Sequence, residues 1–186
     1  MMNIISRRST FAAAVSFLAL FSILIVIRST VAAEPQNPVN FSLRSLNGAP
    51  VTSAGVKGHP VVFAFGATWL PLSRTQLQGL KEIADDFGSK GVLVYWVSTD
   101  SDSPKSKNYA PDEQVRAFAA KYGISVTVLR DPDGAVMKQF GVNQLPAVVI
   151  LDKTGAVAGP PLEGLDPNRS LADQVTPRLN QVLGNH

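Results

Sequence analysis

The chain has 186 residues, of which 45% are hydrophobic and 17% charged, a composition typical of a single folded domain rather than a disordered chain. It contains no cysteine, which excludes thiol–disulfide chemistry by its own side chains. Three of its 17 basic residues lie in the first 33 positions, which hold no Asp or Glu, so 14 basic residues face 14 acidic ones in the remainder and nothing indicates nucleic-acid binding.

The N-terminus predicts an export signal. Arg7-Arg8 precede the uncharged, largely apolar run Phe11–Ile27, and the small residues that follow allow a signal peptidase to cleave after Ala33. Because the run has 17 residues and ends at Arg28, it also suits a membrane anchor that is retained. A buried N-terminal helix of the domain is the third alternative, and the paired arginines also resemble a twin-arginine signal. We therefore expect an exported, periplasmic or otherwise extracytoplasmic protein, with residues 1–33 as a signal peptide or membrane anchor.

The rest of the chain divides into a short linker over residues 34–40 and one domain over residues 41–186. Uninterrupted apolar runs, such as Val61–Phe65, predict strands covered on both faces. Turn residues at Asp152–Gly155 between two apolar stretches predict a hairpin near the end of the domain. The predicted strands are 41–43, 61–65, 92–97, 126–129, 147–151 and 156–158.

Helices are predicted between these strands. After a loop over residues 66–73, apolar residues recur at helical spacing up to Gly88. Pro111 with two following acids is typical of a helix start, because the free amide groups there carry partial positive charge. A short helix over 136–140 and an amphipathic terminal helix containing Pro177 complete the pattern. The alternation predicts an α/β sandwich whose first strands are parallel and whose last strands are antiparallel.

The six residues from Trp69 to Arg74, between a buried strand and a helix, resemble a known active-site motif. Thioredoxin-like proteins of the bacterial envelope, the TlpA/ResA type, and more distantly the AhpC/TSA redoxin group carry Trp-Cys-x-x-Cys-Arg at this place. The resemblance covers Pro38 to Leu183 and implies a thioredoxin-like fold, in which helices flank a central mixed sheet after an N-terminal signal or anchor helix. Further matches are Asn47-Gly48, Lys57-Gly58, Tyr122-Gly123, Asp131-Pro132-Asp133-Gly134, Gly141-Val142, Leu145-Pro146, and Asp152 with Gly155.

The chain differs from this family at the two catalytic positions, because Leu70 and Ser73 stand where the family has its two cysteines. In the family the first thiolate attacks a disulfide and the second resolves the mixed intermediate. We therefore predict no catalytic residue, and oxidoreductase or antioxidant labels would attach by similarity only. Ser73 as a nucleophile would need one of the two histidines, His59 or His186; we expect instead that its hydroxyl satisfies backbone amide groups. No cofactor is expected, and the two distant histidines do not have metal-ligand spacing.

The resemblance also implies a peptide-binding groove beside the motif. In the family a cis peptide bond precedes the proline that matches Pro146, and the residue before it pairs its backbone with an extended peptide beside the motif. The main hypothesis is a redox-silent binding module of the cell envelope that holds a peptide or a partner protein there. The alternatives are an enzyme of another class, a structural role, and a redox role that uses a partner's cysteine. The predicted binding residues are Trp69, Leu70, Pro71, Leu72, Ser73, Arg74, Leu145 and Pro146.

Two further interpretations concern residues near this groove. Trp96 lies inside a predicted strand and is expected in the core, whereas Trp69 is the candidate for stacking on a ligand. The polar segment Thr99–Ala110 follows a central strand and is either a solvated loop or a variable recognition loop.

Overall fold

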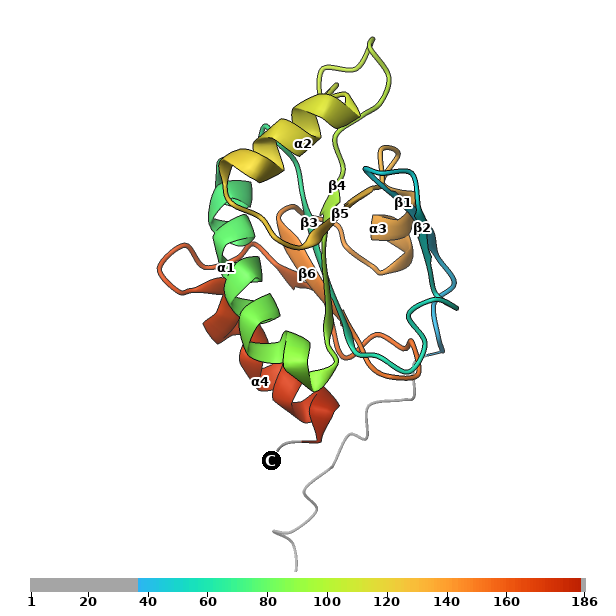
Figure 1. Cartoon of the computed structure of the whole chain (residues 1–186), viewed down its shortest axis with the longest axis vertical. Coiled ribbons are helices and arrows are strands. Elements are labelled where there is room, and N and C mark those ends of the chain that lie inside the picture. Colours follow the sequence, from blue (N-terminus) through green and yellow to red (C-terminus); the bar gives the residue numbers. More distant parts are fainter. Residues whose placement is uncertain (1–36, 185–186) are drawn as a thin grey trace, which may run out of the picture. The chain divides into compact units, whose positions relative to one another are not determined.

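The computed structural model describes residues 37–184, which form one mixed sheet with helices on both faces (Figure 1). The order of the seven strands is β2-β1-β5-β4-β3-β6-β7. The central strands β3, β4 and β5 run parallel, and all other neighbours pair antiparallel. The strands are β1 Ser42–Ser45, β2 Pro50–Thr52, β3 Val61–Gly66, β4 Leu93–Ser98, β5 Thr127–Arg130, β6 Ala147–Leu151 and β7 Leu162–Glu163.

Alternation along β3 separates the core into two layers. Val62 and Ala64 pack with α1, α2 and α4 on one face of the sheet, while Phe63 and Phe65 pack with α3 on the other. Figure 1 shows α1 and α4 side by side on their face, in green and red. The helices are α1 Pro71–Phe87, α2 Asp112–Lys121, α3 Ala135–Gln139 and α4 Leu171–Leu183, with a short 3₁₀ turn at Gly88–Lys90. The predicted α/β sandwich with a mixed sheet is confirmed.

Three details differ from the predictions. The first strand, β1, is antiparallel to β5, and on its other edge it pairs through a short turn with β2, a strand that was not predicted. Helix α1 begins at Pro71, inside the predicted loop, since proline at a first helical position has no N–H to lose. The predicted strand 156–158 makes a single bridge, Leu151 to Val157, and β7 pairs with the start of β6 instead. The predicted arm keeps two backbone hydrogen bonds, from the Asp152 N–H to Ala156 and from the Ala158 N–H to Ile150, and ends at Gly159, at φ +81°, and the two prolines that follow it.

Helix α1 approaches α4 closely at Gly79. A Cβ atom built on Gly79 would lie 2.4 Å from the Cβ of Leu171, so no side chain fits between the two helices there. Leu171, Val175 and Leu179 of α4 are buried against α1 and the sheet. The C-terminal helix is therefore part of the packing that holds the motif helix in place.

The N-terminal segment 1–33, for which cleavage or anchoring was predicted, lies outside the described residues. None of the helices within residues 37–184 combines the length and apolar character needed to cross a membrane.

Candidate binding site

The motif occupies the turn between β3 and α1 and places apolar side chains at the surface. Leu70 is extended, at φ −83° and ψ 121°, and α1 begins with the next residue, Pro71. Trp69 is 52% exposed and Leu72 is 38% exposed, while Leu70 between them is half-buried. Single exposed apolar side chains are common on protein surfaces, so it is the grouping of these three at one turn that makes the surface a candidate binding site.

Ser73 is buried and is not placed as a nucleophile. Its hydroxyl oxygen accepts the Ala67 N–H at 3.1 Å, and its own N–H donates to the Leu70 carbonyl at 3.1 Å. Of the two histidines, His59 lies within residues 37–184. It precedes the start of β3, at the end of the strand away from Ser73, with Nδ1 3.1 Å from the Gly91 carbonyl oxygen. The prediction that Ser73 satisfies a backbone amide is confirmed, although that amide belongs to the preceding loop rather than to the helix.

Gln76, which the sequence reasoning missed, ties the motif helix to the sheet. Its side-chain amide donates to the carbonyl groups of Phe65 at 3.2 Å and Ala147 at 3.1 Å, and its oxygen accepts from the Trp96 indole at 3.3 Å. Gln76 is 1% exposed, so these bonds satisfy a buried polar group. The sequence does carry one signal for Gln76: it is a polar residue on the same helix face as the apolar Leu77 and Leu80, which indicates a buried hydrogen-bonding role.

The hydrogen bond from Gln76 to Ala147 brings Leu145 and Pro146 near the motif helix, because Ala147 directly follows Pro146. The Leu145–Pro146 bond is cis, as the resemblance implies. Pro146 is buried and Leu145 is half-buried. Leu145 also has no backbone hydrogen-bond partner within residues 37–184, which leaves its N–H and C=O available.

Pro71 and Arg74 are exposed on the first turn of α1. The guanidinium carbon of Arg74 lies 5.7 Å from the centre of the Tyr122 ring, a cation–π contact with the residue that ends α2. Arg74 is therefore held against the α2 end of the site. Trp96 is fully buried, which confirms its predicted place in the core.

A buried carboxylate fixes the loop before the motif. Asp100, 0% exposed, accepts the Thr68 N–H at 2.9 Å, the Thr68 hydroxyl at 2.8 Å and the Ser98 hydroxyl at 2.8 Å. Arg130, also buried, donates to the Ser98 hydroxyl at 2.7 Å and to the Ala110 carbonyl at 2.9 Å. Charge-assisted bonds of this kind are the stronger class of hydrogen bond, so the loop is held rigidly at the end of β4.

The same cluster fixes both ends of the segment Thr99–Ala110. Ser101 donates to the Asn108 carbonyl at 2.9 Å and accepts from the Ala110 N–H at 3.0 Å, which closes the segment into a loop. Tyr109 is 39% exposed on it. The loop is solvated and lies beside the motif through the Asp100–Thr68 contacts; its role in recognition stays a prediction.

At the outer rim of this cluster, Asp112 accepts two bonds from Arg44, at 2.6 and 3.0 Å, and lies 3.2 Å from Nε of Arg130. The hydrogen bond from Arg44 holds the pKa of Asp112 below its ordinary value, and the charges of Arg44, Arg130 and Arg116 act in the same direction. A lowered carboxyl pKa stabilises the fold above the ordinary carboxyl range, and this contribution is lost as the pH falls through the lowered pKa.

We therefore expect the Asp112→Asn variant to lose less stability than the wild type as the pH falls below about 4, the ordinary carboxyl pKa. The difference should be below about 1 kcal/mol because both partners are partly exposed. Urea unfolding at a series of pH values measures it, and the comparison is between the two slopes rather than between stabilities at neutral pH. Parallel slopes for the two proteins would contradict the assignment.

Besides its exposed apolar surface, the motif could bind a ligand through metal-coordinating side chains or a cavity. Within the part of the chain that the structure describes, no group of three or more His, Asp or Glu side chains is placed to hold a metal. A cavity of about 20 Å³ lies beside the motif, between Leu72, Gln76 and the segment from Leu165 to Gln174. This space can accept a small apolar group next to the exposed side chains of the motif.

Known proteins share the family and the fold of this chain. The AhpC/TSA family profile matches residues 36–159. Thiol-disulfide oxidoreductase ResA of Bacillus cereus is 27% identical over 118 residues, 63% of each chain. Soluble secreted antigen MPT53 of Mycobacterium tuberculosis is 25% identical over 144 residues, 77% of this chain and 75% of its own. A Chlorobium tepidum protein assigned as the thiol:disulfide interchange protein DsbE has a crystal structure with TM-score 0.67 at 23% identity, covering 81% of this chain and 97% of that one, which shows a shared fold.

Proposed function

Because the chain belongs to the AhpC/TSA family but has no cysteine, we propose that it is a redox-silent binding module that holds an extended peptide of a partner protein at the degenerate motif. The observation that carries the proposal is the exposed apolar surface of Trp69 and Leu72 beside Leu70, on a loop whose backbone is fixed from beneath. A surface without thiols can still bind, because binding needs shape and contacts rather than a nucleophile.

The rigidity of the motif favours binding. The loop from Ala67 to Leu70 is held by the Ser73 hydroxyl, by the Asp100 carboxylate and by its own turn bond from Leu70 to Ala67. A partner that docks there does not have to order this segment, so less conformational entropy is lost on binding. The unpaired backbone groups of Leu145 next to the motif can pair with one residue of an extended peptide.

The chemistry of the surface favours an apolar peptide side chain. Leu70 presents an apolar side chain where the family has a small thiol, and each buried CH₂ contributes about 0.8 kcal/mol. Ordering an extended peptide offsets much of this gain, so we expect dissociation constants that are micromolar or weaker, on the order of 10 μM.

The partner is proposed to lie outside the cytoplasm. The N-terminal sequence predicts export, and MPT53, a relative of similar length, is named as secreted. The two forms of the proposal are a protein released after cleavage at Ala33 and one anchored in the membrane by residues 11–27. Fusion of residues 1–40 to a reporter that works only outside the cytoplasm tests export, and the size of the product separates the two forms.

We expect the Trp69→Ala variant to bind amidated peptides with one central Leu or Phe about tenfold more weakly than the wild type, because it loses the largest exposed apolar contact. Calorimetric titration measures the affinity. For the wild type, Trp69 fluorescence provides a second readout, since the other tryptophan, Trp96, is fully buried and away from the peptide.

Tyr109→Ala is the matched control, because Tyr109 is a comparably exposed aromatic residue outside the motif. Its affinity for the same peptides should stay within about twofold of the wild type. Loss of binding in Tyr109→Ala with none in Trp69→Ala would place the site on the loop Thr99–Ala110 instead. If the wild type binds none of these peptides, the proposed function is wrong.

A further inference from the structure

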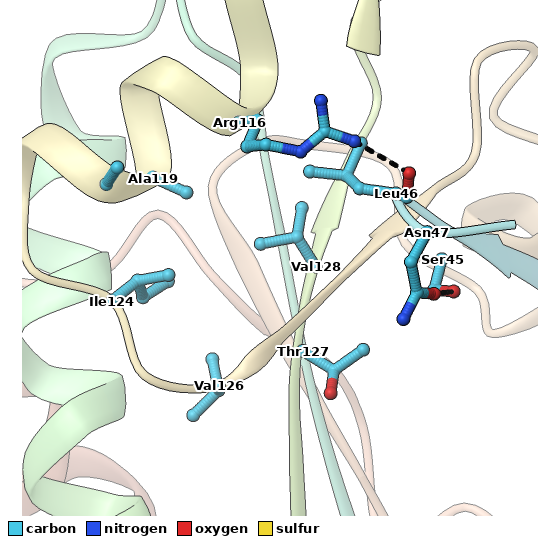
Figure 2. Close-up of a pocket in the computed structure, with 10 residues that line it drawn as sticks. Ser45, Leu46, Asn47, Arg116, Ala119, Ile124, Val126, Thr127 and Val128 are labelled. Atoms are coloured by element: carbon cyan, nitrogen blue, oxygen red, sulfur yellow. Dashed lines mark hydrogen bonds between the residues drawn. The ribbon is translucent and has the colours of Figure 1, made fainter. Parts of the chain in front are cut away.

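A second cavity lies away from the motif, where the sheet is incomplete. It has a volume of about 320 Å³ and lies between α2, β5 and the turn that follows β1. Its lining residues are Ser45, Leu46, Asn47, Arg116, Ala119, Ala120, Ile124, Val126, Thr127 and Val128. Figure 2 shows Ala119 and Ile124 on the helix side, Asn47 on the opposite side, and Val126, Thr127 and Val128 between them. This size lies in the range of small-ligand pockets, about 300–1,000 Å³.

The cavity opens at a free stretch of sheet edge. β1 pairs with β5 only as far as Ser45, and the last bond of the ladder runs from the Leu46 N–H to the Val128 carbonyl at 3.1 Å. Val126 lies in a bend directly before β5, next to the point where this ladder ends. Val126 has no backbone hydrogen-bond partner among residues 37–184. Its N–H and C=O are therefore open to an added segment of extended chain.

Two further hydrogen-bond donors converge on the same space. Arg116 of α2 reaches across the cavity and donates one hydrogen bond, at 2.8 Å, to the Leu46 carbonyl (Figure 2). The Asn47 side-chain oxygen accepts from the Ala49 N–H and shares the Ser45 hydroxyl hydrogen with the Ala49 carbonyl, and its amide nitrogen, on the cavity side, has no acceptor among residues 37–184. Donors without a bound acceptor favour a ligand that brings acceptors, above all a carboxylate.

The local charge favours the same ligand. Arg44 and Arg130 share the carboxylate of Asp112, and within the described residues Arg116 has no carboxylate within 4.0 Å. The rim of the cavity thus carries an excess of positive charge over apolar walls formed by Ala119, Ile124 and Val128. A carboxylate on an apolar body complements both features, and a planar guanidinium binds a carboxylate with two parallel bonds.

We propose that this cavity binds the free C-terminal residue of an extended peptide chain that ends in an apolar side chain. The terminal carboxylate lies between Arg116 and the Asn47 amide, the last side chain enters the apolar cavity, and the peptide backbone pairs with Val126. This mode combines strand addition at a sheet edge with capture of a terminal carboxylate. The site is separate from the motif at the start of α1, so it stands or falls independently of the proposed function.

The test uses isotope-labelled protein in which Trp69 is already replaced by alanine, so that binding at the motif does not interfere. The probes are an acetylated pentapeptide ending in Leu with a free carboxylate, the same peptide with a C-terminal amide, and octanoate. The methyl signals of Ala119 and Val128 report occupancy of the cavity. We expect the acid peptide to shift these signals and the amide to bind at least about tenfold more weakly.

Three variants sharpen the result. Arg116→Gln should remove the preference for the acid over the amide, and Arg116→Lys should retain part of it because the charge remains. Ala120→Leu fills the cavity from an exposed helix position and should abolish binding without affecting the fold. Lys121→Gln removes a neighbouring charge on the same helix, outside the cavity, and should leave the affinity within about twofold.

Each remaining outcome overturns the proposal. Equal affinity for the acid and the amide would mean that the carboxylate is not recognised. Octanoate that binds while the acid peptide does not would make the cavity a site for small acids. An unchanged affinity in Ala120→Leu would place the peptide elsewhere.

Discussion

The double variant Leu70→Cys with Ser73→Cys is expected to form an intramolecular disulfide and to gain thiol–disulfide reductase activity, starting from none in the wild type. The two positions flank the first turn of α1, and the Ser73 N–H already donates to the Leu70 carbonyl at 3.1 Å. Leu70 is half-buried and extended at the end of the loop, where a thiolate would meet a substrate. The free amide groups at the helix start lower the pKa of a thiol there, which raises the fraction of reactive thiolate.

Reduction of insulin by dithiothreitol, with and without the variant, measures the gain, and a thiol count before and after mild oxidation measures the disulfide. The two single variants are the matched controls, because each has one thiol and cannot form the intramolecular bond. We expect activity in the double variant only. A folded double variant in which both thiols remain free after oxidation would show that this loop is not built as the family motif is.

The Gly66→Ala variant is expected to lose about 3 kcal/mol of its free energy of unfolding, because it combines overpacking with disrupted buried hydrogen bonds. A Cβ on Gly66 would lie 2.7 Å from the Gln76 side-chain oxygen, 2.7 Å from the Ser73 hydroxyl and 2.9 Å from the Trp96 indole nitrogen. These groups form the buried polar contacts that fix the motif, so they cannot move aside without losing their partners.

Gly88→Ala is the control for this change. Gly88 has helical backbone angles, φ −59° and ψ −42°, and no atom lies within 4 Å of a Cβ built there. The same substitution should be neutral or stabilise the fold by up to about 1 kcal/mol, since it reduces the entropy of the unfolded chain. Urea unfolding of the three proteins gives the comparison. A Gly66→Ala protein as stable as the wild type would mean that the polar cluster is not closely packed.

The sequence predicted the features that depend on local patterns. The continuous apolar run at Val61–Phe65 identified a central strand, and the glycine at position 88 marked the end of α1. The resemblance to the TlpA/ResA type and the AhpC/TSA group, with both cysteines replaced, is confirmed by the family match and by ResA. That the eight predicted residues bind a ligand stays a prediction, although the structure brings the two parts of the groove together.

Features that depend on distant partners were not predictable in the same way. Gln76 and Asp100 look like ordinary polar residues until the fold places carbonyl and amide groups around them. β7 is only two residues long and depends on pairing with β6, so it leaves no periodic signal. The cavity beside Arg116 arises because β1 turns away from β5 after Ser45, which is a property of strand length rather than of composition.

The close approach of Gly79 to Leu171 also has a consequence for synthesis of the chain, which proceeds from the N-terminus. The motif lies in the first half of the sequence, and the sheet covers part of the apolar face of its helix, but the part around Gly79 is covered only when α4 has been made. A stalled or truncated chain would therefore expose that face to chaperones and proteases instead of yielding a partly working product. The motif is therefore made early, while the packing that supports its helix is completed last.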